Sequence, residues 1–184
     1  MINMEEEAII RQVMPHDLRA EQSVLGAVMI DNDTLPDVCD TLTDEDFYDR
    51  SCRQIFHAIR ELYREAEAVD PVTLSNKLNS LGVPADMRSP ELLGQILNAV
   101  PTAANVGHYV KIVRDKSYTR QMIRLSRDLM ERGYKDEEDS RELIQSAEAE
   151  IFRLSQDFTS AGRRDGSMGE IMMEAMERDR KSVV

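Results

Sequence analysis

Apolar residues recur along almost the whole chain with the 3.6-residue spacing of α-helices, and no segment alternates convincingly with the two-residue period of a strand. The stretch after Asp17 places five of them on one helical face: Ala20, Val24, Leu25, Val28 and Met29. There is no tryptophan, and aromatic residues make up only 5%, so Leu, Ile, Val and Met must fill the core. This composition favours helix-on-helix packing over a β-sandwich. The pattern predicts an all-α protein.

Short capped helices predict a compact globular head over residues 15–102, after a flexible N-terminal lead over residues 1–14. Asp17 and Ser51 are predicted to cap two of its helices. The pairs Asp70-Pro71 and Ser89-Pro90 predict two further helix starts, because proline is favoured in the first helical turn. Gly82 is predicted to end the helix that begins at Pro71.

A long helical hairpin is predicted over residues 103–158. No proline interrupts the chain from Ala103 to Arg132, and Gly133 is the expected end of that helix. Residues 139–142 form a variant capping box, with Asp in place of Ser or Thr, that opens a second long helix. Two long helices joined by a short turn should fold back as an antiparallel pair.

The predicted hairpin has too little core to stand alone, so we expect one face of it to meet another chain. The apolar positions that we assign to this self-association surface lie on both helices: Tyr109, Val110, Val113, Leu143, Ala147, Ile151, Leu154 and Phe158.

A flexible linker over residues 159–167 and a docking helix over residues 168–184 are predicted to follow. Residues 167–170 form a Ser-x-x-Glu capping box at the start of that helix. One side of the helix carries the apolar positions that we expect to dock: Ile171, Met172, Ala175 and Met176. The alternative is a frayed tail, since short isolated helices are marginal in water.

The formal net charge of −12 argues against autonomous binding to nucleic acid or to anionic membranes, which requires clustered Lys and Arg. Cys39 and Cys52 both fall on apolar stripes, so reduced core thiols are expected, with a structural disulfide as the alternative. The acidic N-terminus is unlike a signal peptide, and there is no apolar run of membrane-spanning length. We therefore expect a cytoplasmic protein.

The sequence offers no recognisable catalytic, cofactor-binding or metal site. None of its five lysines follows a glycine, so a phosphate-binding GxxxxGK[ST] loop cannot occur, and there is no GxGxxG, HExxH or CxxC. The acidic runs at residues 31–37, 43–49 and 135–139 lie where helices start or stop, and there carboxylates cap free N–H groups. They lack the ligand spacing and central glycine of a calcium loop. We expect no enzymatic activity from this chain.

Five motifs, in order, resemble the N-terminal domain of DnaB-type replicative DNA helicases. They are Ala20 to Gly26 (AEQSVLG), Asp46-Phe47-Tyr48 with Arg53 to Phe56, Asp70 to Leu74, Val100 to Asn105, and the two hairpin arms with Ile112 to Arg114, Gly133-Tyr134 and Ile151-Phe152. The likeness spans about residues 15–158. It departs at Arg88-Ser89-Pro90, where the family often has a Gly-Gly turn.

The resemblance implies the N-terminal collar of a hexameric helicase, built as a trimer of dimers through the hairpins. It also implies contact with primase and, in some bacteria, with a helicase loader. In the family, ATP, Mg and DNA bind to a RecA-like motor domain that follows a linker helix. The motor is therefore expected to be absent from this chain, and the helix over 168–184 resembles the element that docks on a neighbouring motor.

Two alternatives stay open on the sequence alone. The first is a helical adaptor of the primase type, whose helicase-binding region has a similar fold; the AEQSVLG opening followed by Asp46-Phe47-Tyr48 argues against it. The second is a small helical hydrolase with a dispersed site.

Overall fold

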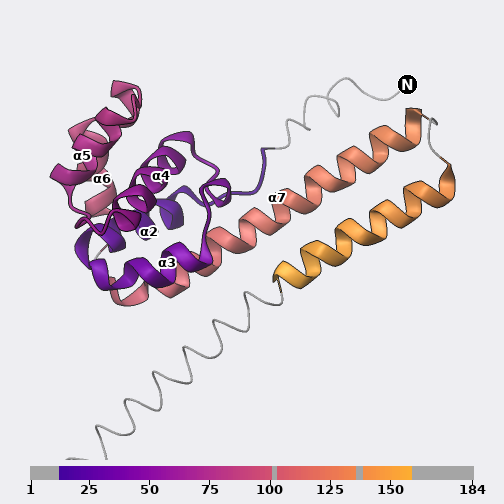
Figure 1. The fold of residues 1–184 in the computed structure, drawn as a ribbon, viewed down its shortest axis with the longest axis horizontal. Helices are drawn as coiled ribbons and strands as arrows, with labels where there is room; N and C mark the ends of the chain where they lie inside the picture. The colour runs from indigo at the N-terminus through magenta and orange to yellow at the C-terminus, as the bar shows by residue number, and fades with distance from the viewer. Residues whose placement is uncertain (1–12, 101–102, 136–138, 159–184) are drawn as a thin grey trace, which may run out of the picture. The chain divides into compact units, whose positions relative to one another are not determined.

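The computed structural model describes residues 13–100, 103–135 and 139–158. These residues form helices and connecting turns, with no strand among them, so the all-α prediction is confirmed. The chain divides into two compact units, residues 1–120 and residues 121–184. Figure 1 shows the helices of both units, and each unit is described by itself below.

The central helix of the first unit is α2 (Leu18–Ile30). Asp17 caps it as predicted, because its carboxylate accepts the backbone N–H of Ala20 at 3.0 Å. All five apolar residues of the predicted stripe are buried, and so are Gly26 and Ala27. A helix buried on more than one side must pack against several neighbours. Figure 1 shows α3, α4 and α6 near it, and α5 packs on α4.

Helix α2 approaches α6 (Pro90–Asn98) closely at Gly26. A Cβ atom on Gly26 would lie 2.5 Å from the carbonyl oxygen of Ile96 and 2.8 Å from Cγ2 of Val100. Only glycine allows the two backbones to come so close. The AEQSVLG motif therefore ends in a glycine for a packing reason.

Acidic residues cap the short helices that follow α2, as predicted. Asp31 begins η1 (Asn32–Thr34) by accepting the N–H of Asp33 at 3.0 Å, and α3 (Leu35–Thr41) continues directly from it. Asp46, the last residue of η2 (Asp44–Asp46), accepts the N–H of Thr43 at 2.7 Å. These carboxylates serve helix termini.

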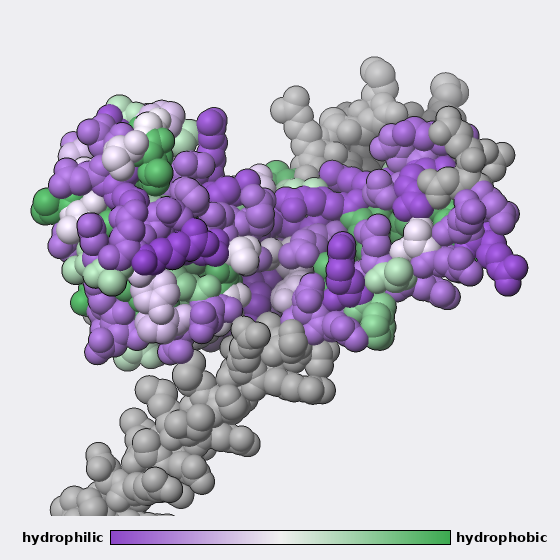
Figure 2. All heavy atoms as spheres, in the orientation of Figure 1, coloured by the Kyte–Doolittle hydropathy of each residue, from purple (hydrophilic) through white to green (hydrophobic). Residues whose placement is uncertain are grey.

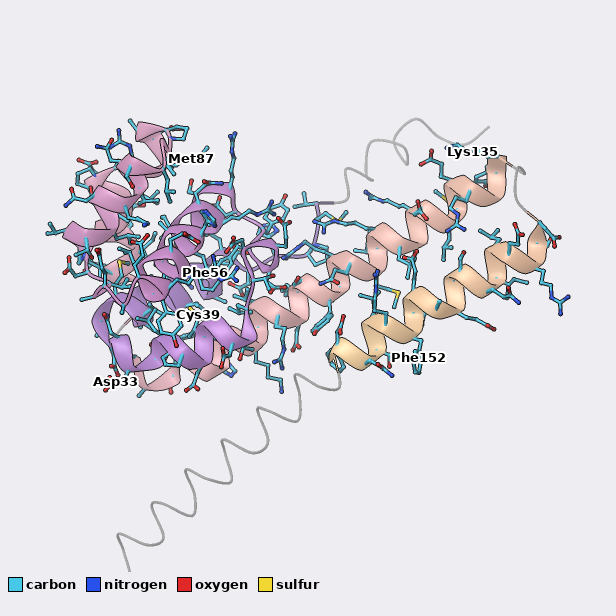
Figure 3. The ribbon with its side chains drawn as sticks, viewed as in Figure 1. Asp33, Cys39, Phe56, Met87, Lys135 and Phe152 are labelled. Carbon is cyan, nitrogen blue, oxygen red and sulfur yellow. The ribbon has the colours of Figure 1, made fainter. Side chains whose placement is uncertain are left out.

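The fourth helix, α4 (Arg50–Arg64), buries Ile55, Phe56 and Ile59 completely. Figure 3 labels Phe56 among the helices of the first unit. The prediction that Ser51 caps α4 is wrong: Asp49 is the N-cap and accepts the N–H of Cys52 at 2.9 Å. Both residues are good caps, and the helix begins two residues earlier because Asp49 is itself held in place by α2, as described below.

The predicted starts of α5 (Pro71–Ser80) and α6 are confirmed. Asp70 caps α5 and Ser89 caps α6, each followed by a proline in the first turn. The two N–H donors of Val72 and Thr73 lower the pKa of the Asp70 carboxyl. Gly82 follows α5 with φ at +69°, the left-handed conformation expected of a glycine that ends a helix.

The side chain of Asn32 fastens the turn before α5 to the end of α2. Its amide nitrogen donates to the carbonyl oxygens of Val28 and Val69, both at 2.9 Å, and its Oδ1 accepts the N–H of Val69 at 2.8 Å. One amide thus satisfies both backbone groups of Val69, a buried residue of the core.

A short turn, η4 (Ala103–Asn105), leads into α7 (Val106–Lys135), a helix of 30 residues. The prediction that Gly133 ends this helix is wrong, because Gly133 lies within α7. A single exposed glycine near a helix end costs only about 1 kcal/mol, and the ion pair between Lys135 and Glu131, 2.8 Å apart, supports the last turn.

In the second unit, the last part of α7 runs antiparallel to a helix over residues 140–158 (Figure 1). The guanidinium of Arg132 donates to Oγ of Ser146 at 2.7 Å, and Leu143 lies 4.0 Å from the position of a Cβ on Gly133. The two helices thus form an antiparallel pair. The boundary between the two compact units lies between residues 120 and 121, whereas the predicted hairpin begins at residue 103. Residues 1–12 of the predicted lead, the predicted linker and the predicted docking helix lie outside the described residues.

Candidate functional site

A buried carboxylate joins α2 to the start of α4. Glu21 is only 1% exposed, and its two oxygens accept the backbone N–H groups of Tyr48 at 2.9 Å and of Asp49 at 3.0 Å. Burial raises the pKa of Glu21, while those two hydrogen bonds and the nearby Arg120 guanidinium act in the opposite direction. Glu21 therefore fixes Asp49, the residue that caps α4.

A second buried charge, Arg120 of α7, holds two distant segments of the first unit. Its guanidinium donates to the carbonyl oxygen of Pro15 at 2.9 Å and to that of Asp46. The same group lies 5.8 Å from the centroid of the Tyr48 ring, on which the His16 ring stacks. The segment before α2 and the turn before α4 are thus tied to α7.

These two networks explain the strongest motifs of the sequence. Ala20 to Gly26 and Asp46 to Tyr48 supply hydrogen bonds and close packing inside the first unit.

Replacing Glu21 with glutamine should lower the free energy of unfolding by about 2 kcal/mol. A glutamine side chain offers one acceptor oxygen where two part-buried N–H donors need one each, so one donor loses its partner. Urea denaturation followed by circular dichroism measures the change. The matched control is Glu67→Gln on the exposed turn after α4, which should leave stability unchanged within error. Equal effects of the two changes would contradict this role for Glu21.

The acidic run at residues 43–49 includes Asp44, whose carboxylate is engaged with other protein groups. Asp44 accepts from Arg60 at 3.1 Å and lies 2.9 Å from Nδ1 of His57. Over residues 13–100, 103–135 and 139–158, no three His, Cys, Asp or Glu side chains are grouped so that they could hold a metal ion.

Both cysteines are free thiols, in agreement with the prediction of reduced core residues. Burial raises the pKa of Cys39 to about 11 and raises that of the more deeply buried Cys52 still further. Neither thiol has the lowered pKa of a reactive cysteine. The described helices also include none that is long and apolar enough to cross a membrane.

The residues predicted for self-association fall into two groups. Val110 and Val113 are buried in the core of the first unit, and Tyr109 packs against it. For these three, the structure shows a role in packing within the chain instead of a surface for another chain. The first turns of α7 complete the core over α2 to α6, which the linear pattern of a long helix does not reveal.

The other five predicted residues lie in the second unit. Leu143, Ala147 and Leu154 are half-buried, whereas Ile151 and Phe158 are 46% and 53% exposed. The predicted docking residues Ile171, Met172, Ala175 and Met176 lie outside the described residues.

The helix over residues 140–158 carries an exposed apolar stripe. Ile144, Ile151 and Phe158 recur every seven residues and so share one side of the helix, and Phe152 lies beside them at 63% exposure. Figure 2 shows apolar side chains on the surface of this unit, and Figure 3 shows Phe152 extending from its helix. Ile144 and Phe152 were not among the predicted residues, although their spacing in the sequence was a visible signal.

A groove of about 390 Å³ opens to solvent between α5 and α6. Its walls include Val72, Leu93 and Leu97. The exposed stripe and this groove are both apolar, as expected of surfaces that bind other proteins.

The first unit is all-α and is held together by buried polar networks. A family model described as the DnaB-like helicase N terminal domain matches residues 13–115. The chain belongs to this family. The resemblance stated from the sequence is thereby confirmed, and the primase-type adaptor is set aside.

Relatives of known identity agree with this assignment. The replicative DNA helicase DnaB of Leifsonia xyli is 35% identical over 141 residues, which cover 77% of this chain and 31% of the relative. The chain thus spans about a third of the length of this curated relative. The crystal structure of the N-terminal domain of DnaB helicase from Mycobacterium tuberculosis is 34% identical, with a TM-score of 0.71 over 76% of this chain and 99% of that one.

Two more distant structures share the fold. The N-terminal domain of DnaB helicase from Helicobacter pylori is 21% identical with a TM-score of 0.55, over 73% of this chain and 99% of that one. A DnaB-like replicative helicase is 19% identical with a TM-score of 0.61, over 75% of this chain and 31% of that one. The descriptions of both structures include their interactions with primase.

Proposed function

We propose that this domain joins subunits of a replicative DNA helicase into a ring and recruits primase to it. The observation that carries the proposal is the match of residues 13–115 to the DnaB-like N-terminal domain, together with an exposed apolar stripe next to the matched region in sequence. The domain acts as a collar and a binding platform.

The assembly part of the proposal rests on the second unit. Its two helices leave Ile144, Ile151, Phe152 and Phe158 each about half exposed or more. A hairpin that leaves this much apolar surface in water gains stability when a second copy covers it. A dimer formed through the hairpins, and a hexamer built as a trimer of such dimers, would cover the stripe.

The primase part rests on the shared fold. Both of the more distant neighbours carry descriptions that include primase interactions, and this chain has the same fold. The first unit is acidic: residues 13–100 contain sixteen Asp and Glu against seven Lys and Arg. Such a surface suits a basic protein partner better than a phosphate backbone. In family members that use a helicase loader, we propose that the loader also binds to this collar.

The motor activity of the whole helicase is assigned to the region that the relatives have beyond the matched part. ATP and Mg would bind there, and contact with DNA would come through that region. We propose that the collar itself hydrolyses no ATP. Its strongest sequence motifs lie among residues that pack the first unit.

Light scattering on the purified chain tests assembly. We expect dimers or larger species at micromolar concentrations, since the apolar stripe is then covered by a second chain. A mass that stays at 21.0 kDa well above that concentration would count against the collar.

Calorimetric titration with the primase of the same organism tests recruitment. We expect saturable binding that weakens as salt is raised, because an acidic surface meets a basic partner. A chain that assembles but shows no binding to primase would keep the assembly half of the proposal and remove the other.

A further inference from the structure

The groove between α5 and α6 is a concave surface of the first unit. Val72, Leu93 and Leu97 form its apolar walls, and the two helix-starting prolines, Pro71 and Pro90, also line it. Val72 is 70% exposed, so its side chain is open to contact with a partner. A volume of about 390 Å³ suits a few side chains of a partner rather than a whole domain.

Gly94 lies in the interior of α6 and faces this groove. A glycine there costs about 0.5–1 kcal/mol of helix stability relative to alanine, so its presence calls for a reason. The fold provides none: a Cβ on Gly94 would meet no atom within 4 Å, whereas one on Gly26 would collide with α6. The absent side chain leaves open a path by which an outside backbone can approach α6.

Charges beside the groove are negative. Asp70 and Glu91 are next to the two lining prolines in sequence. The nearby cations are engaged with the protein itself: Lys77 with the Glu65 carboxylate, and Arg88 with the Val83 carbonyl oxygen at 2.9 Å. A partner for this groove should therefore carry Lys or Arg beside its apolar side chains.

We infer that this groove is where primase docks, through an amphipathic helix whose small or slender apolar side chains pass over Gly94 and whose Lys and Arg face Asp70 and Glu91. The inference rests on the proposed function, and it adds the binding surface and the chemistry of the partner segment. Helix-in-groove recognition uses apolar anchors at positions i, i+3, i+4 and i+7 of the bound helix. The apolar walls formed by Val72, Leu93 and Leu97 can accept such anchors.

The test fills the groove without touching the core. Gly94→Leu adds a Cβ atom that meets no neighbour within 4 Å, extends a side chain into the groove and improves the helix propensity of α6. We expect its thermal midpoint to equal or exceed that of the wild-type chain, while its Kd for purified primase rises about ten-fold or more. The matched control is Gly107→Leu at the start of α7, another glycine with nothing within 4 Å, but not part of the groove. It should bind primase as the wild type does.

Each other outcome overturns the inference in a distinguishable way. If wild type and Gly94→Leu bind primase equally, the groove is not the site and the proposed function stands. If the wild-type chain does not bind primase at all, the recruitment proposal fails and this inference with it. If Gly94→Leu lowers the mass of the assembly and leaves primase affinity unchanged, the occupant is a second copy of the chain. Should Gly94→Leu fail to fold, Val72→Lys at the exposed groove wall gives the same readout, and wild-type affinity in that variant would overturn the inference.

Discussion

Replacing Gly26 with valine should destabilise the first unit by about 3 kcal/mol or more, the upper range of overpacking effects. The new Cβ would lie 2.5 Å from the Ile96 carbonyl oxygen, and backbone cannot move aside as the end of a flexible side chain can. Cγ2 of Val100, at 2.8 Å, blocks the same position. Helices α2 and α6 would have to separate, which opens the core between them. A loss of this size is a large share of the roughly 5–15 kcal/mol that stabilises an ordinary domain.

Guanidinium denaturation followed by circular dichroism should show a lower midpoint for Gly26→Val or, at the extreme, no cooperative transition. The control is Gly94→Ala, which places a methyl group on the same pair of helices where nothing lies within 4 Å. That change should raise stability by about 0.5–1 kcal/mol. If Gly26→Val left the midpoint where it was, the close approach of α2 and α6 would be in doubt.

The sequence predicted the helices well because their signals are local. A cap such as Asp17, Asp70 or Ser89 acts on N–H groups two or three residues away, so its effect can be read from a few adjacent letters. The apolar stripe of α2 could be predicted equally well, because the periodicity of apolar residues indicates which side of a helix is buried.

The failures at Ser51 and Gly133 have a different origin. At the start of α4, two good caps stand two residues apart, and the choice of Asp49 depends on Glu21, a residue 28 positions away. At Gly133, a modest intrinsic penalty is outweighed by interactions within the last turns of α7.

Buried charge was the part of the first unit that sequence reasoning missed. Glu21 and Arg120 looked like ordinary surface residues, because Glu and Arg are rarely buried unless they find partners. Their partners are backbone groups of segments distant in the sequence, such as the carbonyl of Pro15, which lies 105 positions from Arg120. Only the tertiary fold brings them together.

The sequence pattern did not separate the exposed from the half-buried residues of the predicted self-association surface. Ile151 and Phe158 are exposed on the second hairpin helix, whereas Leu143, Ala147 and Leu154, which the sequence analysis grouped with them, are half-buried. A helical wheel shows one broad apolar arc and cannot divide it into the part covered by the chain and the part left to a partner. That division bears directly on how the hairpin can be tested.

Ile151→Glu should weaken self-association by about 100-fold, close to 3 kcal/mol, because it places a charge where a second chain must exclude water. Ile151 is 46% exposed, so the cost within the chain itself should be small and the helices should remain folded. Light scattering across a dilution series should then show monomers at concentrations where the wild type is dimeric or larger, with an unchanged helical circular dichroism signal.

The matched control for that experiment is Arg153→Glu, which also places a carboxylate on this helix, at an exposed position two residues after Ile151 and therefore on a different side from it. It should assemble as the wild type does. Ile144→Glu, 58% exposed and seven residues before Ile151, should reproduce the loss because it lies on the same stripe. Wild-type assembly in both isoleucine variants would place the contact between subunits elsewhere on the chain, whereas equal losses in all three would mean that added charge, and not the apolar stripe, controls assembly.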